Sequence, residues 1–507
     1  MKKFFTLLFL LMFCVSLSYA QRYTSEVFTD DQITVTSNIQ YATNATIFAL
    51  LFDPTVDEFV PEPLFMDVYE PDQGVDSEEE RPVVLVVHGG DALPRLVNNA
   101  CWGDKLDSVT VNTARKLARM GFVAVAPNYR LGWNPLAPTQ DAFLDGLVDA
   151  GVRIQQDMRA CARYLRKDAA EDGNSYNIHP DKIAIWGTSS SAGTYSGFAA
   201  YINEIDEVQT PTFFVTDDQG NVFNTFNEME AGNLDGTVVG MNALGDTTNY
   251  VNNPEYSSAF QLAALGSAIA LDPGVIDADE PPLIMFGNPL STVTQFDAGP
   301  IQLPTTGQVV AIVQLSPGMI KEAFDLGIND AWLGLVDNAT LDQRADPFFG
   351  AVEGWLPLYG DPENEYPWVH WDEVNCPASE TSFDVLPGAE REYALLQIDT
   401  MANYFGPRAC ITLDLDCPDV VNTREVLLAE DAVSLSPNPT DGAFLLEAKL
   451  GRTIEEVVIY SIDGKVVSLF QVNNRIFQSD DLSLAAGFYS IVVRFEDGIA
   501  TKKLIVR

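Results

Sequence analysis

Residues 182–194 constrain the fold of this chain more than any other stretch. An apolar run, residues 183–186, ends abruptly in glycine, small hydroxyl residues and alanine, and residues 195–201 then have the pattern of a helix. A buried strand that turns sharply into a helix, with a serine at the corner, lifts the serine hydroxyl clear of the sheet. Bulky neighbours would clash in such a corner, and the tight turn predicts a strained backbone at the serine.

The rest of the chain supplies strands and helices in alternation. Residues 82–87 are an unbroken β-branched run that ends in His88-Gly89-Gly90, which predicts a strand buried on both faces. Alternating strands and helices predict an α/β fold with a doubly wound, mostly parallel sheet. The other expected elements are an antiparallel strand at 64–69, buried strands at 121–127 and 281–287, regular structure at 259–269, and helices at 111–120, 152–167 and 319–326.

Two stretches lack this regular pattern. Residues 203–256 are rich in Asn, Asp, Gly and Thr, which suits a cap or lid insertion. Residues 342–383 are rich in Pro, Trp and Tyr and are interpreted as an aromatic surface loop.

Length and charge limit the function. A chain of 507 residues predicts two to three domains, and its composition is that of a globular protein. The formal net charge of −43 repels phosphate polymers, so nucleic acid is not expected as a partner. No cofactor is expected either, because His and Cys are too few for a zinc site and no phosphate-binding glycine loop is present.

The N-terminus has the pattern of a secretory signal. Lys2 and Lys3 precede an apolar run that ends in small residues at 18–20, so residues 1–20 are expected to be a signal peptide and no transmembrane segment is expected. Removal of this segment takes Cys14 with it and leaves five cysteines, an odd number. Cys410 and Cys417 flank a short acidic loop and are the best candidate disulfide.

A change of composition near residue 427 indicates a second domain. Short alternating strands separated by turn signals predict a small β-sandwich. We therefore expect a main domain at 21–425 with the insertion near 203–256, and a C-terminal domain at 426–507. The expected C-terminal strands are 443–448, 457–461, 465–470, 488–495 and 501–506.

Two groups of motifs cover most of the chain. The first group is His88-Gly89-Gly90, 128–132, 157–160, 178–183 and the serine-rich corner, and the second is 436–440, 458–465 and 487–491. Through the first group, residues from about 63 to 327 resemble secreted α/β-hydrolases of the carboxylesterase and lipase-like kind. Through the second, residues from about 432 to 507 resemble the C-terminal sorting domain of the type IX secretion system. This second resemblance implies export across the outer membrane, with the secretion machinery as a partner, and a secreted or cell-surface location.

The hydrolase resemblance implies a serine nucleophile and an oxyanion hole. Strand register favours Ser189, with Gly187 two residues before it, and Ser191 is the alternative because it keeps a Ser-Ala-Gly ending. A third interpretation is that these hydroxyls only cap the helix. The backbone amides of Gly89, Gly90 and Ser190 are the expected oxyanion donors.

The base and the acid are less clearly indicated. His88 is expected to support its loop, and His179 to lie in a surface turn, which leaves His370 as the candidate base. Ser291 stands where the family places its acid, and Asp297 is the nearest substitute. Two functions follow: a secreted serine-type carboxylic ester hydrolase acting on a small or polymeric ester, or a catalytically degenerate hydrolase fold that serves as a binding or structural protein of the cell surface.

Overall fold

The β-branched run that ends at His88 forms the centre of a sheet. Strand β3 (Arg81–Val87) is buried along its whole length and pairs in parallel with β4 (Val123–Pro127) on one side and β5 (Ile178–Gly187) on the other. All three strands were predicted from their apolar runs. Burial on both faces is the reason these runs are continuous and do not alternate with polar residues.

Five further strands complete the sheet, in the order β1-β2-β4-β3-β5-β10-β11-β14. Strand β2 is antiparallel to β1 and β4, and the pairs from β4 to β14 are all parallel. The carboxyl ends of β3, β5 and β14 therefore lie at the same edge. The added strands are β1 (Ile33–Ala45), β2 (Pro61–Pro71), β10 (Leu262–Gly266), β11 (Leu283–Gly287) and β14 (Trp355–Pro357).

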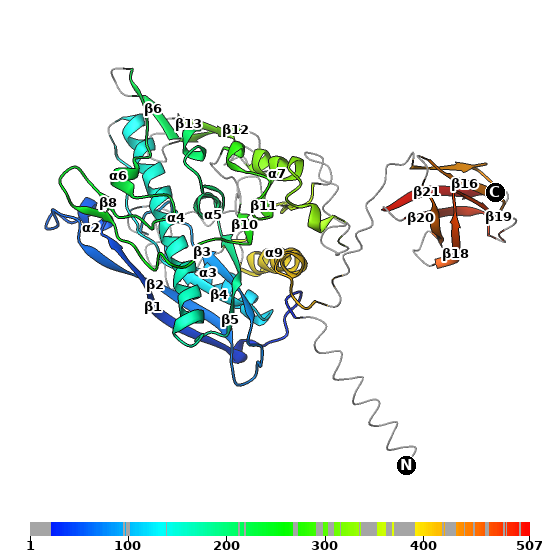
Figure 1. Ribbon diagram of the computed structural model, residues 1–507, viewed down its shortest axis with the longest axis horizontal. Helices are drawn as coiled ribbons and strands as arrows, with labels where there is room; N and C mark the ends of the chain where they lie inside the picture. Colours follow the sequence, from blue (N-terminus) through cyan, green and yellow to red (C-terminus); the bar gives the residue numbers. More distant parts are fainter. Residues whose placement is uncertain are drawn as a thin grey trace, which may run out of the picture. The chain divides into compact units, whose positions relative to one another are not determined.

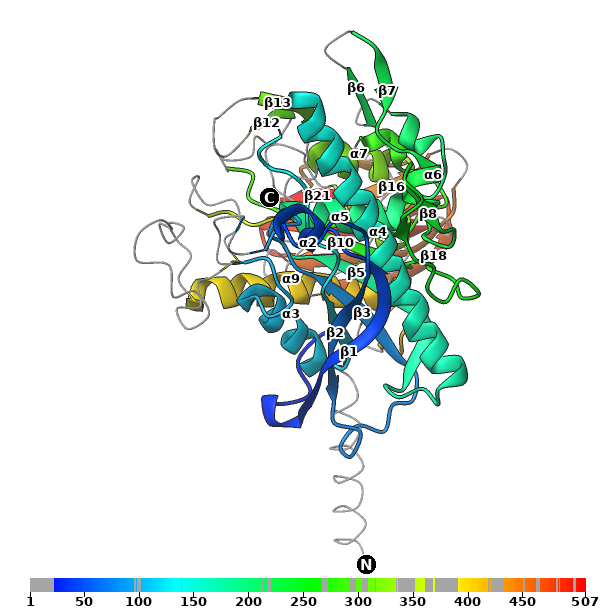
Figure 2. The same ribbon diagram turned by 90° about the vertical axis from the view of Figure 1, so that its left-hand side faces the viewer.

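Helices cover both faces of the sheet (Figure 1). Helices α3 (Ser108–Arg119) and α9 (Arg391–Thr412) pack together on one face, and α4 (Gln140–Glu171) and α5 (Ser190–Tyr201) on the other (Figure 2). This is the predicted α/β fold. The remaining helices of this part are α2 (Phe48–Phe52), α7 (Ser316–Asp325) and the short η1 (Asp30–Gln32), η4 (Pro273–Val275) and η5 (Asp330–Trp332).

The interpretation of residues 342–383 as an aromatic surface loop is wrong at Trp355–Pro357, which form strand β14. Strand β14 lies within it and pairs with β11, and Trp355 is only 5% exposed. The Trp355 ring covers Gly287, where a Cβ would come within 2.8 Å of it. A strand of three residues is too short to show a period, so its aromatic residues appeared to belong to a loop.

The polar stretch 203–256 forms small elements between α5 and β10. They are η2 (Glu207–Gln209), the hairpin β6 (Phe214–Thr216) and β7 (Val222–Asn224), α6 (Glu228–Ala231), and the hairpin β8 (Gly240–Met241) and β9 (Thr247–Asn249). A further hairpin, β12 (Ala298–Gln302) and β13 (Val309–Gln314), follows β11.

Two antiparallel sheets form the C-terminal part, in the orders β15-β16-β19 and β18-β17-β20-β21. Alternate residues of both sheets, among them Leu446, Ile459 and Val493, share one buried core, as expected of the predicted β-sandwich. The strands are β15 (Val433–Ser436), β16 (Phe444–Ala448), β17 (Ile454–Ser461), β18 (Val466–Asn474), β19 (Ile476–Ser479), β20 (Gly487–Phe495) and β21 (Gly498–Val506).

The computed structural model separates into two units, one made of Met1–Ala331 with Asp337–Val420 and the other of Trp332–Val336 with Val421–Arg507. The candidate disulfide Cys410–Cys417 is confirmed. The structure describes residues 22–94, 97, 102–137, 139–210, 213–216, 220–266, 272–290, 298–302, 309–314, 316–333, 335, 352–360, 368–369, 391–417, 420, 432–440, 442–449, 452–461, 466–479, 482, 484–495 and 498–507.

Candidate active site

The serine-rich corner joins β5 to α5. Ser189 is the N-cap of α5, and its hydroxyl accepts a hydrogen bond from the Ala192 N–H at 3.3 Å. Its backbone is extended, with φ −154° and ψ −176°, so the strain expected at the serine is wrong for this residue. The chain enters the helix through an ordinary cap, which requires no left-handed residue.

Three glycines make this corner tight. A Cβ at Gly187 would lie 2.5 Å from the Ala192 carbonyl oxygen, and one at Gly193 would lie 2.5 Å from the Gly266 carbonyl oxygen. Since real Cβ atoms do not approach so closely, the first turn of α5 packs its backbone directly against the ends of β5 and β10. The sequence showed Gly187 and Gly193 beside the serines, but nothing in it linked Gly266 to them.

The loop after β3 lies against the same corner. A Cβ at Gly89 would come within 2.4 Å of Ser189 Oγ, so the backbone of this loop lies directly against the serine side chain. The His88 ring stacks on Tyr129 at 4.2 Å and donates through Nδ1 to the Gly89 carbonyl oxygen at 2.8 Å. His88 is buried, and it supports the loop as the sequence predicted.

Hydrogen bonds hold the carbonyl groups of this loop. The Tyr129 hydroxyl donates to the His88 carbonyl at 2.9 Å and lies 3.2 Å from the Gly89 carbonyl oxygen. In a trans peptide the N–H points opposite to the C=O. The N–H of Gly90 is therefore directed away from Tyr129 and His88.

Gly90, Asp91 and Ala92 all have positive φ, at 102°, 54° and 56°. Consecutive positive φ angles are uncommon for residues with a side chain. Hydrogen bonds from residues outside the loop hold this conformation. The Trp133 indole donates to the Asp91 carbonyl at 2.6 Å, and the Gly132 N–H donates to the Ala92 carbonyl at 2.8 Å. The result is that the Asp91 N–H faces Ser191 Oγ at 3.4 Å.

Sequence reasoning missed Asp91. Asp91 keeps an exposed surface, but the protein atoms around the carboxyl withdraw it from bulk water and raise its pKa, an effect that the hydrogen bond to Ser191 partly offsets. A side chain on a loop whose shape depends on distant residues gives no signal in a single sequence.

The structure thus brings together five of the predicted site residues: Ser189, Ser190, Ser191, Gly89 and Gly90. The two candidate nucleophiles are neighbours, with their hydroxyl oxygens 3.4 Å apart. Ser189 is 6% exposed, while Ser190 and Ser191 are half-buried at the start of α5.

The other two predicted residues, His370 and Asp297, lie outside the described residues. Trp368, which precedes His370 by two positions, is buried, and its indole N–H donates to the Thr188 carbonyl oxygen at 2.7 Å. His179 is half-buried near the start of β5, at the opposite end of that strand from Ser189, and its Nδ1 accepts from the Asp181 N–H.

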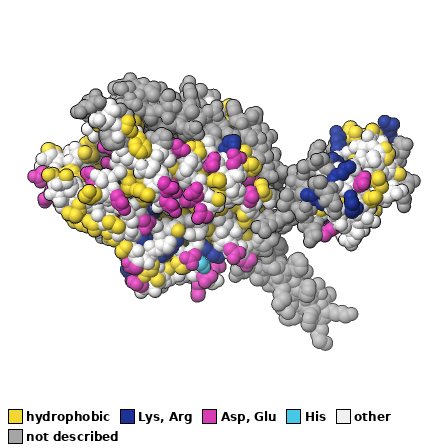
Figure 3. Space-filling view, turned by 45° about the horizontal axis from the view of Figure 1, so that its top comes forward, with side chains coloured by type: hydrophobic (Ala, Val, Ile, Leu, Met, Phe, Trp, Pro, Cys, Tyr) yellow, Lys and Arg dark blue, Asp and Glu magenta, His cyan; other side chains and the backbone are white. Residues whose placement is uncertain are grey.

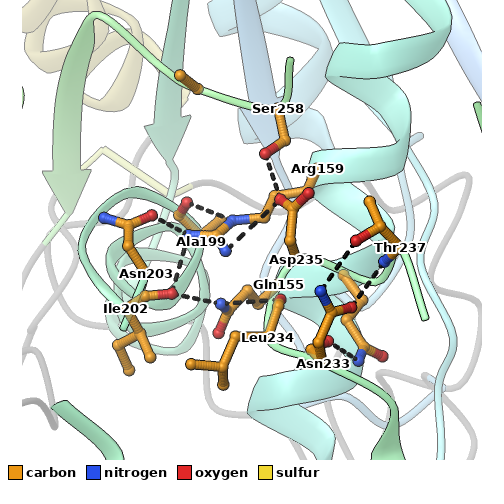
Figure 4. Close-up of polar contacts among 12 residues, drawn as sticks. Gln155, Arg159, Ala199, Ile202, Asn203, Asn233, Leu234, Asp235, Thr237 and Ser258 are labelled. Atoms are coloured by element: carbon orange, nitrogen blue, oxygen red, sulfur yellow. Dashed lines mark hydrogen bonds and ion pairs between the residues drawn. The ribbon is translucent and has the colours of Figure 1, made fainter. Parts of the chain in front are cut away.

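Helix α4 anchors the insertion beside this site. Gln155 donates to the Ile202 and Leu234 carbonyl groups, and Arg159 to those of Ala199 and Ile202 (Figure 4). Asp235 lies near the same arginine and accepts from the Ser258 hydroxyl. Arg163 and Arg166, on the next turns of α4, bind the carbonyl groups of further residues: Asp235, Asn252, Ser257 and Ala259.

Two features are absent from the described part of the chain. No group of three or more His, Cys, Asp or Glu there is arranged to hold a metal ion. No helix in that part combines the length and hydropathy needed to cross a bilayer.

Comparisons with known proteins match two parts of the chain. Residues 66–227 match the family model described as BD-FAE, and residues 434–507 match the model described as secretion system C-terminal sorting domain. None of the curated proteins compared matches this chain.

Several solved structures are similar at low identity. Esterase 2 of Thermogutta terrifontis, phosphoramylated by tabun, is 16% identical with a TM-score of 0.29, over 53% of this chain and 76% of that one. The same esterase with propionate bound is 15% identical, with the same TM-score and coverage. MGS-M1, an alpha/beta hydrolase enzyme from a deep-sea metagenome library of the Medee basin, is 14% identical with a TM-score of 0.25, over 50% of this chain and 72% of that one.

The BD-FAE match covers the strands and helices that form the serine corner and the loop after β3, and the second match covers the β-sandwich. The chain therefore carries an α/β-hydrolase domain and a C-terminal sorting domain of the type IX secretion system, and it is a secreted or cell-surface protein.

Proposed function

We propose that the protein is a serine-type carboxylic ester hydrolase that acts outside the cell on a small or polymeric ester. Ser189 is the nucleophile, His370 the general base and Asp297 the acid that orients it. The N–H groups of Gly89, Gly90 and Ser190 stabilise the oxyanion. Residues 1–20 are a signal peptide that is removed on export.

The observation that carries this proposal is the contact between Gly89 and Ser189. It places a hydroxyl at a helix N-terminus directly beside a glycine loop whose carbonyl groups are held on the other side by Tyr129 and His88. Backbone N–H groups aimed at the space where negative charge develops are the main requirement for acyl transfer. The dipole of α5 adds positive potential at the same point.

Ser189 suits the nucleophile better than Ser191. It stands at the junction of strand and helix, next to the end of β5, whereas Ser191 already lies in the first turn of α5. A nucleophile at the junction leaves the N–H of the following residue, Ser190, at the start of the helix to receive the oxyanion.

Two observations support His370 as the base. Strand β14 is the last parallel strand among the described residues, its carboxyl end lies at the sheet edge where β3 and β5 also end, and His370 follows it in the sequence. The Trp368 indole bonds the carbonyl of Thr188, the residue before the nucleophile. Only one residue, Val369, separates Trp368 from His370 in the sequence.

The reaction follows from these roles. His370 accepts the Ser189 hydroxyl proton as Oγ attacks the ester carbonyl carbon, and the resulting oxyanion receives hydrogen bonds from the loop after β3 and from Ser190. The tetrahedral intermediate collapses, and the alcohol leaves with the proton from His370. Water, deprotonated by His370, then hydrolyses the acyl-enzyme and returns Ser189 to its starting state.

The alternative is a degenerate hydrolase fold that only binds a ligand. It is favoured by one observation: Ser189 has a relaxed extended backbone and its hydroxyl caps α5, which is what a purely structural serine does.

Turnover of short p-nitrophenyl esters by the purified mature protein separates the two. We expect Ser189→Ala and His370→Ala to abolish measurable turnover, and a fluorophosphonate probe to label wild type but not Ser189→Ala. Loss in Ser191→Ala with retention in Ser189→Ala would transfer the nucleophile to Ser191. A wild-type protein with neither turnover nor labelling would be the degenerate fold.

Ser196 provides a matched control on the same helix. It is fully buried, and its hydroxyl has no hydrogen-bond partner among the residues that the structure describes, so Ser196→Ala removes a serine from α5 without touching the site. We expect this variant to keep wild-type turnover. If it loses as much as Ser189→Ala, the losses reflect damage to α5.

A further inference from the structure

Trp368 is buried against the corner that carries the candidate nucleophile. Its indole N–H donates to the Thr188 carbonyl oxygen at 2.7 Å, and the next residue, Val369, is buried as well. The ladder that pairs β5 with β10 ends one residue before Thr188, at Gly187. The indole therefore supplies a hydrogen bond to a buried carbonyl group that lies beyond the last pair of that ladder.

Thr188 is fixed from the other side by β3. Its backbone N–H and its hydroxyl both donate to the Val87 carbonyl oxygen, at 3.2 and 2.9 Å. The donors of Thr188 thus point to one neighbouring strand, and its acceptor points to Trp368. Because the peptide unit is planar, these contacts together set the plane of the peptide that joins Thr188 to Ser189.

The same bond shows that the chain moves back along the sheet edge after β14. In the order β5-β10-β11-β14, three strand spacings of about 4.8 Å each, roughly 14 Å in all, separate β14 from β5. Strand β14 ends at Pro357, and by Trp368 the chain has returned to the end of β5. Trp368 is therefore the point at which the part of the chain after β14 is attached to the nucleophile corner.

We propose that Trp368 is a positioning residue that holds His370 beside Ser189. The inference rests on the proposed function, in which His370 is the base. Two residues of chain span at most about 7 Å, so the bond at Trp368 ties the backbone of His370 to the nucleophile corner. A base must come within hydrogen-bond reach of the hydroxyl whose proton it takes, and Trp368 limits how far the base moves from that hydroxyl.

Removal of the indole N–H tests the proposal. Trp368→Phe keeps an aromatic ring, and we expect kcat on p-nitrophenyl acetate to fall about tenfold with KM within about twofold of wild type, because a misplaced base slows proton transfer and leaves ester binding unchanged. A fluorophosphonate probe should label this variant to the same extent as wild type, but about tenfold more slowly. Labelling to the full extent excludes the explanation that most of the variant is unfolded.

Trp186→Phe is the matched control. Trp186 is also buried, and its ring packs 5.1 Å from that of Phe405 on α9, on the face of the sheet opposite α5. The same truncation there should lower the melting temperature at least as much as Trp368→Phe and leave kcat within about twofold of wild type. If kcat falls in both variants in proportion to the loss of melting temperature, Trp368 is only structural and the proposal is overturned.

The length of chain on each side of Trp368 gives a second test that leaves the tryptophan unchanged. A glycine inserted between Val369 and His370 keeps the Trp368 bond but adds about 3.5 Å of chain before the base, so kcat should fall more than about tenfold. The same insertion after Gly360, before the bond, should leave kcat within about threefold of wild type, because the contact at Trp368 separates it from the base.

Equal losses of kcat from the two insertions, or wild-type kcat in Trp368→Phe, overturn the role of Trp368, while turnover by the wild type keeps the proposed function. A wild type with neither turnover nor labelling overturns both.

Discussion

Close backbone contact is what makes the candidate site possible at the scale of single residues. Gly89, Gly187, Gly193 and Gly266 allow the loop after β3, the end of β5, the first turn of α5 and the end of β10 to meet without side chains between them. A methyl group at Gly187, Gly193 or Gly266 would push two backbone segments apart, and one at Gly89 would meet the Ser189 side chain. These glycines are needed because a side chain would not fit, whereas glycines in turns are often needed because the backbone has a positive φ.

Two glycine-to-alanine changes in neighbouring helices should therefore have opposite effects. In Gly193→Ala the new Cβ meets the Gly266 carbonyl at 2.5 Å, and we expect the free energy of unfolding to fall by about 2 kcal/mol or more. In Gly146→Ala, within α4, the nearest atom is 3.7 Å away, so better helix propensity should stabilise the protein by about 0.5–1 kcal/mol. Urea denaturation measures both, and equal effects would contradict the packing argument.

Part of the site could be predicted from single residues. The spacing between the end of the strand and Ser189 and the glycines after His88 were readable, because each motif is continuous in the sequence. Asp91 and Trp368 were not, since their contacts join segments about 100 and 180 residues apart. The strain expected at Ser189 was wrong because a helix cap gave the chain a relaxed route around the corner.

At the scale of elements, α4 is the scaffold that holds the polar stretch 203–256. Its Asp157 accepts from the backbone N–H and the guanidinium of Arg130 and from the Asn44 amide, all buried. Arg130 in turn donates to the Thr248 carbonyl in the insertion. One ion pair therefore ties α4 to the loop after β4, to β1 and to the insertion.

Breaking this pair should be costly. In Asp157→Asn the buried Arg130 loses its counter-charge, and we expect the free energy of unfolding to fall by about 3–5 kcal/mol. Asp325→Asn, which removes the exposed pair with Lys321 on α7, should change it by about 0.5 kcal/mol or less. If the two variants lose similar amounts of unfolding free energy, burial does not determine how much an ion pair contributes to stability.

Elements with long apolar runs were predictable, whereas a very short strand and a helix without an apolar face were not. The unbroken apolar runs predicted strands β3, β4 and β5, because strands buried on both faces of a sheet are apolar throughout. The pattern of residues 195–201 predicted helix α5. Strand β14 has three residues, too few for a period. Helix α9 escaped prediction because its apolar residues do not gather on one face and it contains Pro407.

At the scale of the whole molecule, charge is unevenly divided. Residues 432–507 hold eight basic and nine acidic residues, so nearly all of the net charge of −43 belongs to the hydrolase part. Figure 3 shows acidic side chains spread over the hydrolase unit and basic ones gathered on the C-terminal unit. Within the hydrolase unit, burial raises the pKa of Glu62, Asp149 and Glu280 to about 7.

These raised pKa values predict that the stability of the folded protein decreases as the pH rises. A carboxyl group with a higher pKa in the folded state contributes stability below its unfolded pKa, near 4, and loses that contribution as pH rises to about 7. We expect a higher melting temperature at pH 5 than at pH 8. Asp149→Asn, which imitates the protonated acid, should raise the melting temperature by about 2 °C at pH 8 and leave it unchanged at pH 5. If the melting temperature rises equally at both pH values, the ionisation of Asp149 is not the cause.

The arginines of α4 have one more consequence. These buried guanidinium groups, on Arg159, Arg163 and Arg166, donate hydrogen bonds to backbone carbonyl groups. Three further arginines are also buried: Arg81, Arg130 and Arg408. Digestive enzymes of the trypsin type must thread an extended, accessible Arg or Lys into their specificity pocket. In the folded protein these six arginines are therefore closed to such an enzyme, although the unfolded chain would expose them to it.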